Sequence, residues 1–184
     1  PVKQKLGQKI SEVEIDNGVD WRKKHWNSIV QNYGKAAAFR DYADDLEQVY
    51  AREWLNLAEL NLCLLEMLLR WMQIPTRVLR SGQMKAQGKA SELVLVLCRE
   101  AGADRYLSGI GGKGYLDEAA FRSAGVEILY RPPVLPAPYP QQYPKAGFLN
   151  DLSMIDLILN CGRQWSTYLD DGNLSRPLSR QAGG

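Results

Sequence analysis

Residues 105–131 read RYLSGIGGKGYLDEAAFRSAGVEILYR, and this stretch decides the fold class. Residues 105–108 favour a short strand, and the glycine-rich loop GIGGKG follows at 109–114. A helix is expected over about 116–124 and another strand over 126–130. Strands separated by a helical crossover pair in parallel, so the stretch predicts a βαβ unit.

Further elements are expected on both sides of this unit. Before it, residues 76–81 predict another strand, 82–88 a loop, and 90–101 a helix that ends at Gly102. After it, a proline-rich segment at 132–144 leads to a helix over 152–161, with Asn150 or Asp151 as its cap. The order predicts the α/β class: a mostly parallel sheet built from βαβ units with helices on its faces.

The first third of the chain predicts a helical region. Ile10, Val13 and Ile15 favour a short strand that ends at an Asn-Gly turn. Helices are expected over about 21–33 with Asp20 as N-cap, over about 40–52, and from Asn56 to a point before Pro75.

Composition and net charge limit the classes of protein and partner that the sequence can represent. The 184 residues are 45% hydrophobic and 24% charged, values of a soluble globular protein, which predicts a single domain over 1–172 and a disordered tail over 173–184. The 23 basic and 21 acidic residues give a net charge of +2, which argues against nucleic-acid binding and against an acidic membrane surface. The apolar stretch 57–74 carries charged side chains, so we expect no membrane span.

Cysteine and histidine usage narrows the chemistry further. The three cysteines lie far apart in apolar surroundings, which favours buried, reduced thiols and a cytoplasmic protein. The single histidine excludes a histidine-cluster metal site, whereas magnesium bound by carboxylates stays open.

The glycine loop is a candidate ligand site. Gly109, Gly111 and Gly114 fit the spacing GxGxxG after a strand and before a helix, where backbone amides can hold a phosphate. A dinucleotide site is disfavoured because Tyr130 and Arg131, not an acid, end the next strand. Contact with a phosphate or carboxylate and a tight turn that needs positive φ remain the two alternatives.

Two polar side chains on apolar helix faces are further candidates. His25 shares a helix face with Trp21 and Ser28. It is either a packed residue or a catalytic base. Asp156 interrupts an apolar helix, and it shares a polar stripe with residues one turn to either side, Ser153 and Asn160. Capping of a loop and substrate binding are equal alternatives for it. The loop at 138–141, with Tyr139 and Gln141, either wraps the core or borders a pocket.

Three groups of residues in order carry a resemblance that extends from the first residues to about Gly162. They are WRKKHWNSI at 21–29 with Tyr33-Gly34-Lys35-Ala36 and Phe39; YLSG at 106–109 with Gly114-Tyr115-Leu116, Phe121 and Gly125-Val126; and Tyr139-Pro140-Gln141 with Phe148-Leu149, LSMIDL at 152–157 and Asn160-Cys161-Gly162. In these segments the chain resembles the WbqC-like family of bacterial proteins. The resemblance also implies that the chain begins after the family's N-terminal strand and its His-Gln-Pro-type segment.

Members of that family occur in gene clusters for O-antigen and other surface polysaccharides, and one suggested role is glycine or aminoacyl transfer to an amino sugar. The resemblance thus implies a cytoplasmic acyl-type transferase. Its partners would be a sugar-nucleotide or amino-sugar substrate and an activated acyl donor, with aminoacyl-tRNA left open as donor. No cofactor or metal is expected. The alternatives are a non-catalytic protein that binds a sugar nucleotide or a carrier-bound intermediate, and an oxidoreductase that rests on the glycine loop alone.

Candidate residues for this chemistry follow. Aminoacyl transfer needs a deprotonated amine and donors for the developing oxyanion. The expected catalytic residues are His25, Ser108 and Asp156. The expected substrate-binding residues are Tyr33, Gly109, Gly111, Gly114, Tyr115, Tyr139, Gln141, Ser153 and Asn160.

Overall fold

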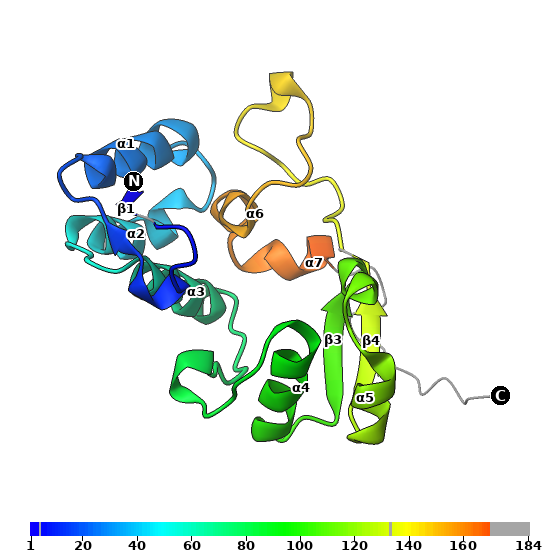
Figure 1. Ribbon diagram of the computed structural model, residues 1–184. Helices are drawn as coiled ribbons and strands as arrows, with labels where there is room; N and C mark the ends of the chain where they lie inside the picture. Colours follow the sequence, from blue (N-terminus) through cyan, green and yellow to red (C-terminus); the bar gives the residue numbers. More distant parts are fainter. Residues whose placement is uncertain (4, 133, 170–184) are drawn as a thin grey trace. The chain divides into compact units, whose positions relative to one another are not determined.

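The computed structural model describes residues 1–3, 5–132 and 134–169, and the tail expected at 173–184 lies outside these residues. Contacts divide the chain into two compact units (Figure 1). Unit 1 comprises Pro1–Pro75 and Leu135–Gly184, and unit 2 comprises Thr76–Val134. Each unit has a hydrophobic core of its own. The single domain over 1–172 stays a prediction.

Unit 1 is mainly helical. Its helices are α1 (Trp21–Tyr33), α2 (Phe39–Ala51), α3 (Leu57–Trp71), α6 (Met154–Cys161) and α7 (Trp165–Leu169). They bury apolar faces against one another, with Leu46, Ile158 and Leu159 fully inaccessible to solvent. The expectations for α1, α2 and α6 are confirmed to within two residues at each end, and α3 begins after Asn56 and ends before Pro75 as expected.

The helix caps correct part of the prediction. Asn56 caps α3, because its Oδ1 accepts hydrogen bonds from the backbone N–H groups of Ala58 and Glu59 at 2.8 and 3.2 Å. Asp20 makes no such bond to α1. Ser153 caps α6 through the N–H of Ile155, so the prediction of Asn150 or Asp151 was wrong. Several polar residues precede each helix, and the sequence pattern alone does not determine which of them reaches the first turn.

A short antiparallel pair joins the N-terminal residues to the strand expected near Ile15. β1 (Val2–Lys3) pairs with β2 (Glu14–Ile15), and Val2 lies opposite Ile15. The expected strand is shorter than its pattern suggested, because Ile10–Glu12 forms a 3-10 turn. The inward side chain of Ile15 joins the core of unit 1.

Unit 2 contains the βαβ unit that the glycine-rich stretch predicts. β3 (Arg105–Gly109) and β4 (Glu127–Arg131) pair in parallel, and α5 (Glu118–Ser123) connects them. α4 (Ala90–Glu100) precedes β3. Phe121 is fully buried and packs with Cys98, Leu116 and Val126. The remaining 3-10 turns are Ser81–Gln83, Ile110–Gly114, Pro144–Ala146 and Gly162–Gln164.

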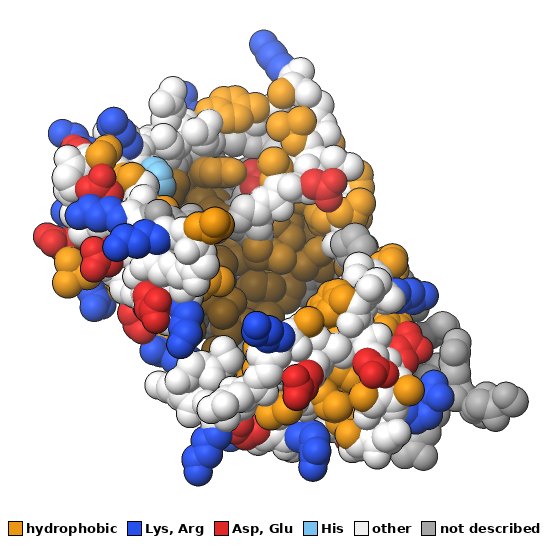
Figure 2. Space-filling model, in the orientation of Figure 1, with side chains coloured by type: hydrophobic (Ala, Val, Ile, Leu, Met, Phe, Trp, Pro, Cys, Tyr) orange, Lys and Arg blue, Asp and Glu red, His pale blue; other side chains and the backbone are white. Residues whose placement is uncertain are grey.

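The sheet is smaller than expected. Residues 76–81 form no strand, and the sheets of the described residues are one parallel and one antiparallel pair. The described residues are therefore of mixed helix and strand type, with a small parallel sheet that one βαβ unit forms, and the extended parallel sheet stays a prediction. Among the described residues no helix is long and apolar enough to cross a membrane. On the face drawn in Figure 2, basic and acidic side chains are interspersed, in keeping with the net charge of +2.

Candidate functional site

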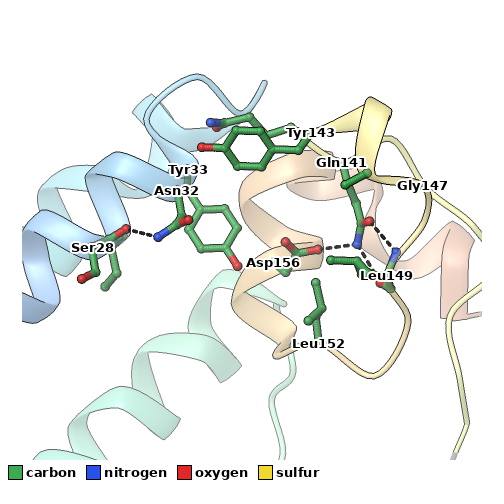
Figure 3. Close-up of a pocket in the computed structure, with 12 residues that line it drawn as sticks. Ser28, Asn32, Tyr33, Gln141, Tyr143, Gly147, Leu149, Leu152 and Asp156 are labelled. Carbon is green, nitrogen blue, oxygen red and sulfur yellow. Dashed lines mark hydrogen bonds between the residues drawn. The ribbon is translucent and has the colours of Figure 1, made fainter.

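Unit 1 contains a pocket of about 330 Å³. Its walls come from α1, from the loop that precedes α6 and from the first turn of α6 (Figure 3). The lining residues are Ser28, Ile29, Asn32 and Tyr33 of α1; Gln141, Gln142, Tyr143, Ala146, Gly147, Leu149 and Leu152 of the loop; and Asp156 of α6. All of them belong to unit 1.

Helical periodicity explains the α1 wall. Ser28 and Asn32 are four residues apart, as are Ile29 and Tyr33, so two adjacent rows of side chains face the pocket. Asn32 Nδ2 donates to the backbone oxygen of Ser28 at 2.7 Å, which holds the amide against the helix. The Tyr33 hydroxyl points toward Asp156 (Figure 3).

Asp156 is the buried acid of the pocket. It lies in the first turn of α6 and is only 5% exposed. The Tyr139 hydroxyl and the Gln141 side-chain amide both donate to its Oδ2, at 2.5 and 3.0 Å. Its position near the N-terminus of α6 adds a favourable interaction with the helix dipole. Neutral donors and the helix dipole thus stabilise this carboxylate.

The loop before α6 is fixed by hydrogen bonds at several points. Gln141 exchanges two with the backbone of Leu149: its Nε2 donates to the oxygen and its Oε1 accepts from the N–H, both at 2.9 Å. The Tyr143 hydroxyl donates to the backbone oxygen of Gln31 at 3.0 Å, and Gln142 Oε1 accepts from the N–H of Lys35 at 3.1 Å. These bonds hold the loop as a wall of the pocket beside the end of α1.

Two tyrosines at the pocket have raised pKa values. Burial, with the charge of Asp156 as a second cause, raises the pKa of Tyr33 to about 12. Burial and the hydrogen bond to Asp156 also raise the pKa of Tyr139. Both phenols therefore keep their protons at neutral pH. Asp156 is the only acidic or basic side chain among the lining residues, apart from the two phenols of Tyr33 and Tyr143. The pocket can bind amines and hydroxyl groups, whereas its lining offers no cationic side chain for a phosphate.

The sequence-predicted residues of unit 1 are only partly brought together. Tyr33, Gln141 and Asp156 line the pocket, and Tyr139 donates a hydrogen bond to Asp156 without lining the pocket itself. The other predicted residues of unit 1 do not line it: Ser153 caps α6, Asn160 donates to the backbone oxygen of Asp156 at 2.8 Å, and His25 is exposed.

His25 packs against aromatic rings, at 5.4 Å from that of Trp21 and 6.0 Å from that of Tyr50. The imidazole thus contacts two aromatic rings although the residue is exposed to solvent. Its catalytic role stays a prediction, and so do the substrate contacts of Ser153 and Asn160.

The remaining predicted residues belong to unit 2. Ser108 is buried, and its hydroxyl donates to the backbone oxygen of Gly109 at 3.0 Å. Gly109, Gly111, Gly114 and Tyr115 are exposed. None of the three glycines has a positive φ, so the interpretation as a tight turn that needs positive φ was wrong. Within this loop the glycine with a steric requirement is Gly112, where a Cβ would clash with the Ser108 Oγ.

Several lining residues were missed by the sequence analysis. Asn32 carries a usable signal, because it follows Ser28 by one helical turn on the face already singled out for His25. Leu149, Leu152 and Gly147 carry none, because they lie in an irregular loop without periodicity. No group of three or more metal-ligating side chains occurs in the part of the chain that the structure describes.

Comparison with known proteins gives the family. The model of the WbqC-like protein family matches residues 1–168. A protein of Mycobacterium tuberculosis (strain ATCC 25618 / H37Rv), described as "Uncharacterized protein Rv1507c", is 34% identical over 169 residues, which are 91% of this chain and 72% of the relative. No solved structure matches the chain significantly. With a family match over nearly all of the described residues, the chain belongs to the WbqC-like protein family.

Proposed function

We propose that this protein transfers an acyl group of the aminoacyl (glycine) type to an amino sugar during the assembly of O-antigen or another surface polysaccharide. The chain belongs to the WbqC-like family, and the occurrence of such proteins in gene clusters for surface polysaccharides supports the link to glycan assembly. The observation that carries the proposal is the buried carboxylate of Asp156 beside a pocket with no other fully charged side chain. A carboxylate in this setting suits the binding of a sugar that carries an amine.

The chemistry assigns one clear task to the pocket. An acceptor amine that binds as an ammonium group first gives one proton to solvent, and the neutral nitrogen then attacks the carbonyl carbon of an activated acyl donor. A C–N bond forms, the leaving group departs with the electron pair of its bond, and the nitrogen loses a second proton. Asp156 can take that proton, because the phenols of Tyr33 and Tyr139 already hold theirs at neutral pH. Gln141 and Tyr139 keep the carboxylate in one orientation.

The direct test is turnover. The full chain is incubated with free and nucleotide-linked amino sugars and with activated glycine donors (a thioester and glycyl-tRNA), and mass spectrometry detects sugars that have gained a glycyl residue. We expect product with the wild type and at least a hundredfold loss in Asp156→Asn, the range for removal of a general base. Absence of product with every donor contradicts the proposal.

His25→Ala tests the assignment made from the sequence. Full activity of this variant would remove His25 from the mechanism. Lost activity with unchanged melting would place the histidine in it, because the exposed imidazole contributes little to the core.

A second candidate is a non-catalytic protein that presents a sugar nucleotide or a carrier-bound intermediate to an enzyme. One observation favours it: neither histidine nor cysteine is among the described residues that line the pocket. Calorimetry separates the two candidates, because sugar binding without turnover supports the binding protein.

A further inference from the structure

We propose that the unit 1 pocket is a site for a protonated primary amine, with Asp156 as its counter-ion. This site rests on the proposed function in one respect only, namely the identity of the molecule that carries the amine. Two sources share this chemistry: the ammonium group of an amino sugar and the α-ammonium group of an aminoacyl donor.

The first argument is charge. Asp156 is 5% exposed, and both side chains that donate to it, Tyr139 and Gln141, are neutral. Among the residues that the structure describes, Asp156 forms no ion pair with a lysine, arginine or histidine; pairs such as Arg70–Asp45 and Arg105–Asp104 lie elsewhere. A buried carboxylate without a counter-ion is costly, and a ligand cation would offset that cost.

The second argument is geometry. Tyr139 and Gln141 both donate to the same carboxylate oxygen, Oδ2. The carboxylate lies at the pocket and faces the Tyr33 hydroxyl on its other side (Figure 3). The Tyr33 hydroxyl interacts with Asp156 and keeps its proton, so its oxygen retains lone pairs. An ammonium group has three N–H donors and no acceptor, so it can donate both to the carboxylate and to this neighbouring phenol oxygen.

The third argument is the surrounding wall. Ile29, Leu149 and Leu152 line the pocket with apolar side chains, which reduce the hydration of a bound charge and strengthen its attraction to Asp156. The rings of Tyr33 and Tyr143 add faces that attract cations. No lysine or arginine is among the described lining residues, so an anionic group would meet the repulsion of Asp156 without a cationic side chain to offset it. The nucleotide phosphates of a sugar nucleotide are therefore expected to remain outside this pocket.

The test uses small probes in matched pairs. Glycinamide and glucosamine carry a protonated amine at about pH 6.5. In N-acetylglycinamide and N-acetylglucosamine, a neutral acetamide replaces that charged amine. Each is titrated into the 15N-labelled full chain, and Kd is taken from NMR shifts. We expect at least one amine to bind about tenfold or more tightly than its acetylated counterpart, because a charge-assisted hydrogen bond is replaced by a neutral one. The shifts should centre on the Gln141 side-chain amide and on the backbone N–H of Leu149.

The choice between the pairs identifies the source of the amine. Preference for glycinamide assigns the pocket to the aminoacyl group, and preference for glucosamine assigns it to the sugar. Equal or absent binding of the charged and acetylated probes by the wild type overturns the inference, and this comparison needs no variant. Turnover is measured in a separate assay. Failure of the amine probes to bind would therefore overturn the ammonium site but not acyl transfer, and absence of turnover would overturn acyl transfer but not the ammonium site.

Two variants locate the charge. Asp156→Asn should abolish the preference for the amine. Asp151→Asn removes a carboxylate five residues away that is exposed and does not line the pocket, and it should leave the preference unchanged. A folded Asp156→Asn variant that keeps the preference would contradict the assignment of Asp156 as counter-ion.

Discussion

Replacement of Tyr139 by Phe tests whether the Asp156 carboxylate depends on its neutral donors. Tyr139 is 7% exposed, and its hydroxyl donates to Asp156 Oδ2 at 2.5 Å. Its ring packs edge-on against Phe148 and Tyr168, with centroids 5.2 and 5.8 Å away. Phenylalanine keeps these ring contacts, so Tyr139→Phe removes one hydrogen bond and little else.

The expected magnitude follows from the charge of the acceptor. A hydrogen bond to a charged group contributes about 1.5–3 kcal/mol. Gln141 remains as a second donor to the same oxygen, so we expect a loss of about 2 kcal/mol in the free energy of unfolding of unit 1. For a chain of this length that corresponds to a fall in Tm of roughly 4–8 °C.

The assay can be restricted to unit 1. All five tryptophans, at positions 21, 26, 54, 71 and 165, lie in this unit, so tryptophan fluorescence during urea denaturation reports its unfolding. In a double-mutant cycle, Tyr139→Phe should cost about 1 kcal/mol less when residue 156 is already Asn, because the acceptor is then neutral. Tyr143→Phe, whose exposed hydroxyl donates to the backbone of Gln31, is the matched control and should cost less than about 1 kcal/mol. A Tyr139→Phe variant as stable as the wild type would refute the reasoning.

Three further predictions concern unit 1 at high pH, the helix cap and the glycine loop. The pKa of Tyr33 is raised from 10.0 to about 12, so the native state holds this proton more tightly than the unfolded chain does. The free energy of unfolding should therefore fall as pH rises from about 10 to about 12. Tyr33→Phe should reduce that fall, as measured by denaturation followed by tryptophan fluorescence. Asn56→Ala should cost about 1 kcal/mol and Asp20→Ala almost nothing, because the Asn56 side chain caps its helix and that of Asp20 does not. In hydrogen exchange, Gly112→Ala should exchange faster than the wild type around Ser108, since its Cβ would clash with the buried side chains of Ser108 and Leu116 and both must shift. Gly111→Ala meets nothing within 4 Å and should resemble the wild type.

Local patterns in the sequence predicted most of the helical elements. The bounds of α1 follow from a 3.6-residue pattern that ends at Gly34, and the start of α3 follows from Asn56 and its cap. The βαβ unit followed from the order of elements between residues 105 and 131. These features depend on neighbours within one or two turns, and such neighbours can be read from the sequence.

Features that depend on distant partners could not be predicted. Residues 76–81 have the composition of a strand, but a strand needs a partner, and the structure provides none there. His25 and Tyr33 share α1, yet only Tyr33 lines the pocket, because the loop that supplies the opposite wall attaches at the C-terminal end of the helix. The bond between Gln141 and Asp156 also depends on how that loop folds back, for which no local pattern exists.

The chemistry of Asp156 argues for a ligand beyond the needs of the fold. Three residues that follow it in α6, Leu157, Ile158 and Leu159, are at most 2% exposed, so packing at this end of the helix is supplied by apolar side chains. An asparagine at position 156 could accept the same hydrogen bonds from Tyr139 and Gln141 without a buried charge. Relative to asparagine, the carboxylate strengthens these hydrogen bonds, but it also brings a buried charge with which no cationic side chain among the described residues forms an ion pair. A buried negative charge beside a pocket whose described lining has no cationic side chain is therefore the ground on which we propose an ammonium ligand.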